Sequence, residues 1–236
     1  MAVINDPGLA ANVLQVGMGA GTIWTPGHVA SGPLPVGTGG AYRLSMSSGT
    51  MAASLGANSE IFQFRYVTAA SRVCLIHGIS ISAAVLTLPA VSTTVLVGPL
   101  AFRATQARGW SVAGSGGTRA TMTGDNQNLR TTHATSEVND IGICTTAALT
   151  AGTKTLDAQD IGSVVGSTGV LTAVGVQPQG IIIPKTNLMG DFAGSLAFPV
   201  VCANQEGIVV RVGPAFPATM TWAFTIDIAW SEVQGF

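Results

Sequence analysis

The sequence of residues 218–233 reads ATMTWAFTIDIAWSEV and alternates large apolar residues with small or polar ones. The large apolar residues recur at every second position; they are Met220, Trp222, Phe224, Ile226, Ile228 and Trp230. Successive side chains of a β-strand point to opposite faces, so this period of two predicts a strand with one buried and one exposed face. A helix would not place Phe224 and Ile228 on the side of the two tryptophans.

Shorter stretches upstream show the same alternation. In residues 60–67, Phe62 and Phe64 share a face opposite Gln63 and Arg65. Residues 72–86 also alternate, and one face is predicted to hold Val73, Leu75, Ile79, Ile81 and Val85 with His77 among them. The other face is predicted to hold Cys74, Ile76, Ser80 and Ser82. The core predicted from these faces contains Phe62, Phe64, Leu75, Ile79, Trp222, Phe224, Ile226, Ile228 and Trp230.

Further strands are expected at residues 42–51, 100–110, 138–148, 196–202 and 207–212, and residues 156–166 are the best candidate for a short helix. Many short strands separated by turns predict an all-β protein, an antiparallel two-sheet sandwich that is jelly-roll-like or Greek-key. Residues 41–236 form this sandwich domain. Residues 1–40, rich in Gly and Pro, are predicted to be an extended N-terminal arm for attachment, with the apolar anchors Val13, Leu14, Val16, Ile23 and Trp24.

The composition points to a subunit of an assembly. Charged residues make up 9% of the chain and the net charge is -1, whereas about 25% charged residues is usual. Nearly neutral surfaces tend to associate, so we expect a homo-oligomer, a trimer or a dimer. The arginines are dispersed and form no patch that would bind nucleic acid. Gly and Pro interrupt the apolar stretch 73–102, so no membrane helix is expected, and no signal peptide is recognised at the N-terminus.

The sequence offers little for catalysis or for binding a metal or cofactor. There is no GxSxG motif, and His28, His77 and His133 lack metal-ligand spacing. Asp157 and Asp160 are candidates for a carboxylate pair that cleaves glycosides, but acids in a polar segment are usually solvated or capping residues. A turn explains Asp125, Asn126 and Asn128 better than a calcium site. The thiols of Cys74, Cys144 and Cys202 are expected to be small buried groups in a chain that folds in a reducing cytoplasm.

Several segments resemble structural proteins encoded in tailed-bacteriophage genomes. They are EIFQFRYV (60–67), CTTAALTAGTKTLDAQDIG (144–162), CANQEGIVVR (202–211) and TWAFTIDIAWSEV (221–233). The resemblance implies a non-enzymatic virion protein, made in the host cytoplasm, that decorates or cements the capsid exterior by binding the major capsid protein or other virion proteins. The alternative is a tail fibre, tail tip or head-fibre protein that contacts the host receptor. No catalytic residue is implied.

Overall fold

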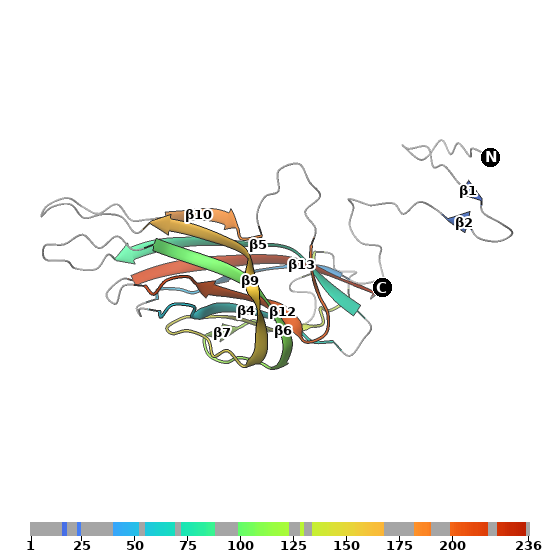
Figure 1. The fold of residues 1–236 in the computed structure, drawn as a ribbon, viewed down its shortest axis with the longest axis horizontal. Helices are drawn as coiled ribbons and strands as arrows, with labels where there is room; N and C mark the ends of the chain where they lie inside the picture. The colour runs from blue at the N-terminus through green and yellow to red at the C-terminus, as the bar shows by residue number, and fades with distance from the viewer. Residues whose placement is uncertain are drawn as a thin grey trace, which may run out of the picture. The chain divides into compact units, whose positions relative to one another are not determined.

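The structure is a computed structural model that describes residues 16–17, 23–24, 40–51, 55–68, 72–87, 99–122, 128–129, 134–167, 182–189, 199–216 and 221–234 (Figure 1). The chain divides into two compact units, residues 1–34 and 35–236. In the first unit, β1 (Val16–Gly17) pairs antiparallel with β2 (Ile23–Trp24). The predicted arm residues Val16, Ile23 and Trp24 lie in this strand pair, whereas Val13 and Leu14 lie outside the described residues.

The second unit is a sandwich of two antiparallel sheets, seen as two layers in Figure 1. The five-stranded sheet has the order β10-β5-β13-β3, and β11 also pairs with β5. Its strands are β3 (Gly40–Ser47), β5 (Arg72–Thr87), β10 (Ile182–Asn187), β11 (Val200–Cys202) and β13 (Thr221–Gln234). The six-stranded sheet has the order β7-β8-β4-β12-β6-β9. Its strands are β4 (Glu60–Tyr66), β6 (Pro99–Val112), β7 (Thr118–Arg119), β8 (Val138–Ile143), β9 (Thr153–Ser167) and β12 (Glu206–Val212).

The strand pairing is that of a jelly roll. β3 pairs with β13, β4 with β12, β5 with β10 and β11, and β6 with β9. The early strands of the domain thus pair with the late ones in nested order, and successive pairs fall alternately in the two sheets, as in two interlocked Greek keys. β7 and β8 extend the six-stranded sheet beyond β4. The predicted all-β antiparallel sandwich is confirmed.

β13 contributes one whole face to the core, as its alternation predicts. Trp222, Phe224, Ile226, Ile228 and Trp230 are each at most 2% exposed. The rings of Trp222 and Phe224 stack with centroids 5.0 Å apart, and Trp230 lies between Tyr42 of β3 and Phe64 of β4, at 5.4 and 5.3 Å. The aromatic side chains of β13 therefore bridge the two sheets, and large buried rings dominate the packing energy.

The prediction for the first half of β5 is wrong because the strand contains a bulge. Gly78 pairs with Ala229 but Ile76 pairs with Trp230, so His77 is an extra residue in the ladder. An extra residue reverses which face the side chains on one side of it occupy. Cys74 and Ile76 consequently join Ile79 in the core, whereas Leu75 is only half-buried and His77 is exposed.

The helix considered at residues 156–166 is also not formed, because this segment lies within β9. β9 pairs with β6 through several register shifts, so its side chains do not follow a clean period of two. No helix in the described part of the chain is long and apolar enough to cross a membrane.

Candidate functional site on the outer faces of the sandwich

Two loop segments cover the outer face of the six-stranded sheet at β4. The Ser115 amide donates to Thr150 Oγ1 at 2.7 Å, and the Thr150 amide donates to the Ser115 carbonyl at 3.0 Å. Gly114 allows this close approach, since a Cβ there would lie 2.4 Å from Gln63 Oε1. β4 is therefore buried on both faces, unlike the half-buried strand that its alternation predicts.

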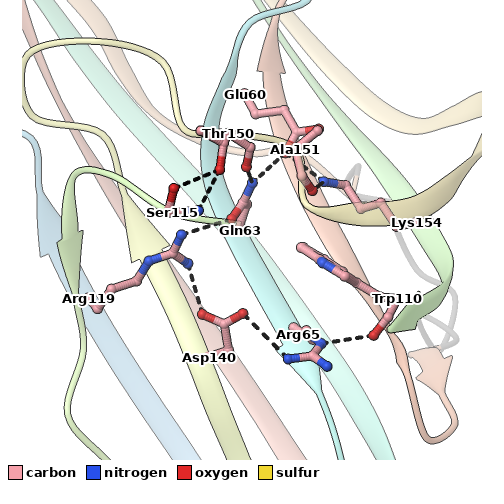
Figure 2. Close-up of polar contacts among 10 residues, drawn as sticks. All are labelled: Glu60, Gln63, Arg65, Trp110, Ser115, Arg119, Asp140, Thr150, Ala151 and Lys154. Carbon is pink, nitrogen blue, oxygen red and sulfur yellow. Dashed lines mark hydrogen bonds and ion pairs between the residues drawn. The ribbon is translucent and has the colours of Figure 1, made fainter. Parts of the chain in front are cut away.

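Beneath these loops lies a group of polar side chains that we call the Gln63 cluster (Figure 2). Gln63 Nε2 donates to Glu60 Oε2 at 2.5 Å and to the Thr150 carbonyl at 2.7 Å. Arg119 Nη2 donates to Gln63 Oε1 at 3.2 Å, so the donors and acceptors around the amide fix its orientation. The other members are Arg65, Trp110, Asp140 and Lys154.

Lys154 is the most unusual member of the cluster. Its side chain is 2% exposed, and its Nζ lies 2.8 Å from Glu60 Oε2 and also donates to the Ala151 carbonyl. The Nζ sits 4.4 Å from the centroid of the Trp110 ring, a cation–π arrangement. Burial lowers the pKa of Lys154, and the hydrogen bond that Lys154 donates to Glu60 opposes this shift.

Two arginines hold the lower part of the cluster together. Arg119 Nη1 bonds Asp140 Oδ1 at 2.8 Å, and Arg65 Nε donates to the Trp110 carbonyl at 2.9 Å (Figure 2). Gly142 leaves room for the Arg119 guanidinium, because a Cβ there would lie 2.5 Å from its Nη1. Trp110 also packs with Ala107, Val209 and Leu156 in a small second apolar cluster. The side chains of the Gln63 cluster that hold the two loop segments over β4 thus come from residues far apart in the sequence.

Charge pairs also join β6, β9 and β12, on the outer face at Asp160 and at the end of the sheet around Arg108. Arg108 binds Asp157 at 2.8 Å and Glu206 at 3.0 Å. Asp160 accepts from Arg211 at 3.1 Å and from Thr105 Oγ1 at 2.6 Å. Asp157 and Asp160, the candidate carboxylate pair of the sequence, therefore engage different arginines. This arrangement neutralises both carboxylates and provides no paired acid and base.

The outer face of the five-stranded sheet is different in character. Its outward side chains are mostly small, namely Ser45, Ser47, Ser80, Ser82, Ala84, Ala223, Thr225 and Ala229. A groove of about 340 Å³ runs over β10, β5 and β13. Ser82, Ala84, Ala223, Thr225 and Lys185 are among the residues that line it, and Ile182 at its wall is 71% exposed. The ion pair between Lys185 Nζ and Asp227 Oδ2, at 2.7 Å, flanks the small residues.

The histidines and cysteines form no reactive centre in the described part of the chain. His77 Nε2 lies 2.7 Å from Ser231 Oγ on the outer side of β5 and β13, whereas His28, His133, Asp125 and Asn126 lie outside the described residues. All three cysteines are buried free thiols, and Cys74 lies opposite Cys202 in the β5–β11 ladder. Among the described residues, no group of three His, Cys, Asp or Glu side chains could hold a metal ion.

The sequence analysis missed Glu232, a buried carboxylate at the end of the inner face of β13. It is 0% exposed and accepts hydrogen bonds from Ser136 Oγ at 2.5 Å and from the Glu137 amide at 3.0 Å. Burial raises its pKa, although these hydrogen bonds act in the other direction. Glu232 lies two residues after Trp230, so the alternation along β13 places it on the inner face and predicts its burial.

No protein-family model matches the chain, and no curated protein matches it either.

Proposed function

We propose that this protein is a non-enzymatic structural subunit of a tailed-bacteriophage virion that decorates the capsid exterior. The contrast between the two outer faces is the observation that carries this proposal. On the outer face of the six-stranded sheet, Asp140 and Asp160 are each held by an arginine of the same chain, and at the end of that sheet Arg108 holds Asp157 and Glu206. The five-stranded face instead presents small side chains and a groove.

The energetics of desolvation favour the five-stranded face as the contact surface. Covering an ion pair with a partner removes water from two charges, which is costly unless new partners replace it. Burying serine, alanine and threonine side chains costs much less free energy of desolvation. Burying exposed aliphatic side chains such as those of Ile182 and Leu86 is favourable. We therefore place the contact with the capsid shell on the outer face of β5, β10 and β13.

The distribution of aromatic residues supports decoration over receptor binding. Sugar-binding sites commonly present exposed aromatic rings. Every tryptophan and tyrosine whose side chain the structure describes is buried, and the large exposed apolar residues are aliphatic; they are Leu86, Val112, Leu129, Val165, Ile182 and Val201. The jelly roll itself serves both capsid and lectin domains, so the fold alone does not choose.

The N-terminal unit is proposed to assist attachment. The described core residues, from Tyr42 to Trp230, all lie in the second unit. Deletion of residues 1–34 should leave the far-UV circular dichroism of the sandwich and its melting temperature near the values of the full chain, while weakening oligomers or capsid binding. Loss of folding in the truncated chain would contradict the proposed division.

Cryo-EM of particles that carry a labelled copy of the chain tests the proposal directly. Density for the label over the capsid shell is the expected result. Density confined to the tail or to fibres would overturn capsid decoration in favour of the receptor-binding alternative.

A further inference from the structure

The Gln63 cluster brings an amine and a carboxamide to the same oxygen atom in a nearly dry site. Glu60 Oε2 accepts from Lys154 Nζ at 2.8 Å and from Gln63 Nε2 at 2.5 Å (Figure 2). The Gln63 side chain is fully buried, and the side chains of Lys154 and Glu60 are 2% and 9% exposed. An ion pair needs only Glu60 and Lys154, so the buried amide beside it and the arginine on the amide oxygen call for a further explanation.

We propose that Lys154 and Gln63 react to form an intramolecular amide cross-link, with Glu60 transferring the protons. This inference does not depend on the proposed place of the protein in a virion. It assigns the Gln63 cluster a single covalent reaction within the chain rather than turnover of a substrate.

Each side chain of the cluster has a defined part in the reaction. Lys154 Nζ is the nucleophile, and Gln63 Cδ is the carbon that it attacks. Glu60 lies within hydrogen-bond reach of both nitrogens, which is the position required of an acid and base. Arg119 Nη2, 3.2 Å from Gln63 Oε1, stabilises the negative charge that develops on this oxygen during attack.

The reaction balances without any added reactant. Proton transfer from the Lys154 ammonium to Glu60 leaves a neutral amine and a neutral acid. The amine forms the new C–N bond at Gln63 Cδ, and its extra proton passes to Glu60 as Glu60 protonates Gln63 Nε2. The old C–N bond then breaks, and the departing ammonia takes up the proton that Glu60 first received from Lys154. The products are a secondary amide and an ammonium ion, and Glu60 is again a carboxylate.

The surroundings favour this chemistry in two ways. Burial lowers the pKa of Lys154, which increases the share of the nucleophilic neutral amine. The Trp110 ring and the loop at Gly114 exclude water, and the two reacting residues are held by β4 and β9, so little freedom is lost on reaction. The product would tie the start of β9 to β4 on the outer face of the six-stranded sheet.

Intact-mass measurement of the full chain under denaturing conditions tests the proposal. After prolonged storage of the folded protein, the mass should be lower than the sequence mass by one ammonia molecule, allowing for removal of the first methionine. Because cyclisation of an asparagine also releases ammonia, fragmentation must show one branched peptide that joins residue 63 to residue 154.

Two variants complete the test. Lys154→Arg keeps a cation beside Glu60 but offers no nucleophilic amine, so it should retain the full mass and show native circular dichroism. Glu60→Gln removes the proton carrier and should also retain the full mass. A wild-type chain of unreduced mass would overturn the proposal, as would ammonia loss that persists in Lys154→Arg, or loss of water in place of ammonia, which would place the link at Glu60.

Discussion

The outer face of the six-stranded sheet and the outer face of the five-stranded sheet cover the same core but differ in chemistry. The first carries arginines and carboxylates joined to one another, such as Arg119 with Asp140 and Arg211 with Asp160. The second carries mostly small side chains and, among the described residues, the Lys185–Asp227 pair with the exposed Arg43 near Asp227. A low overall charge therefore does not mean an evenly uncharged surface, because most of the described charged side chains lie beside side chains of opposite charge.

The difference has a consequence for association. A partner that covers the six-stranded face has to desolvate ion pairs, whereas the five-stranded face can be covered by close packing at small cost. Of the four experiments below, the first and third compare the two faces of β13. The second compares a buried with an exposed ion pair of the six-stranded sheet, and the fourth compares the two outer faces.

The largest expected effect separates the inner and outer faces of β13. Trp222→Ala removes a fully buried ring that stacks on Phe224 and should lower the free energy of unfolding by about 3 to 5 kcal/mol. Thr225→Ala, on the outer face, should change it by about 0.5 kcal/mol. Urea titrations of the two variants compare them, and equal shifts of their midpoints would mean that the assignment of faces is wrong.

The next effect distinguishes buried from exposed charges on the six-stranded face. Lys154→Met leaves the Glu60 carboxylate buried without its cation and should cost about 3 kcal/mol. Arg103→Met removes one half of an ion pair at 3.8 Å whose arginine side chain is 45% exposed, and should cost less than about 1 kcal/mol. The same urea titrations measure both. If Lys154→Met proved as mild as Arg103→Met, the buried ion pair of the Gln63 cluster would contribute no more to stability than an exposed one.

A smaller effect is expected in the pH dependence of stability, and it has opposite signs on the two faces of β13. Burial raises the pKa of Glu232, so its contribution is full below the ordinary glutamate pKa and is lost as pH rises through the raised value. The pKa of Asp227 is lowered: burial acts to raise it, but the hydrogen bonds from Lys185 and Ser45 outweigh burial. Its contribution is present above the ordinary aspartate pKa and is lost as pH falls through the lowered value.

Thermal melts of Glu232→Gln and Asp227→Asn across the acidic range measure these signs. The stability advantage of the wild type over Glu232→Gln should increase as pH falls, and its advantage over Asp227→Asn should decrease. The same sign for both variants would show that Glu232 is not held as a buried acid.

How much could be predicted from the sequence depends on the regularity of each strand. β13 keeps its inner face on even positions over its whole length, so its buried residues and the sandwich architecture follow from alternation alone. The sequence gives no sign of the bulge at His77 other than the neighbouring Gly78. The bulge reverses the faces on which Leu75 and Cys74 lie. In β9, polar residues occupy both faces because arginines of β6 and β12 form ion pairs with Asp157 and Asp160. The periodicity of a local stretch of sequence does not show partners that lie so far away along the chain.

The Gln63 cluster could not be predicted for a similar reason. Gln63 reads as an outward polar residue of a half-buried strand, and it is buried because segments from residues 113–115 and 149–151 close over it. The one available signal was that Lys154 is one of only two lysines in a chain otherwise reliant on arginine. A lysine has an amine that shifts its pKa readily and can react, which an arginine does not.

The contrast between the outer faces is tested most directly by capsid binding of two variants that receive the same new charge. Ala223→Glu places a carboxylate in the groove of the five-stranded face, and Ser163→Glu places one on exposed β9 of the six-stranded sheet. Co-sedimentation with capsids that lack the protein should show binding weakened at least about tenfold by Ala223→Glu, because an unpaired charge is buried at the contact, and unchanged by Ser163→Glu. Binding that is lost in Ser163→Glu and retained in Ala223→Glu would contradict the account.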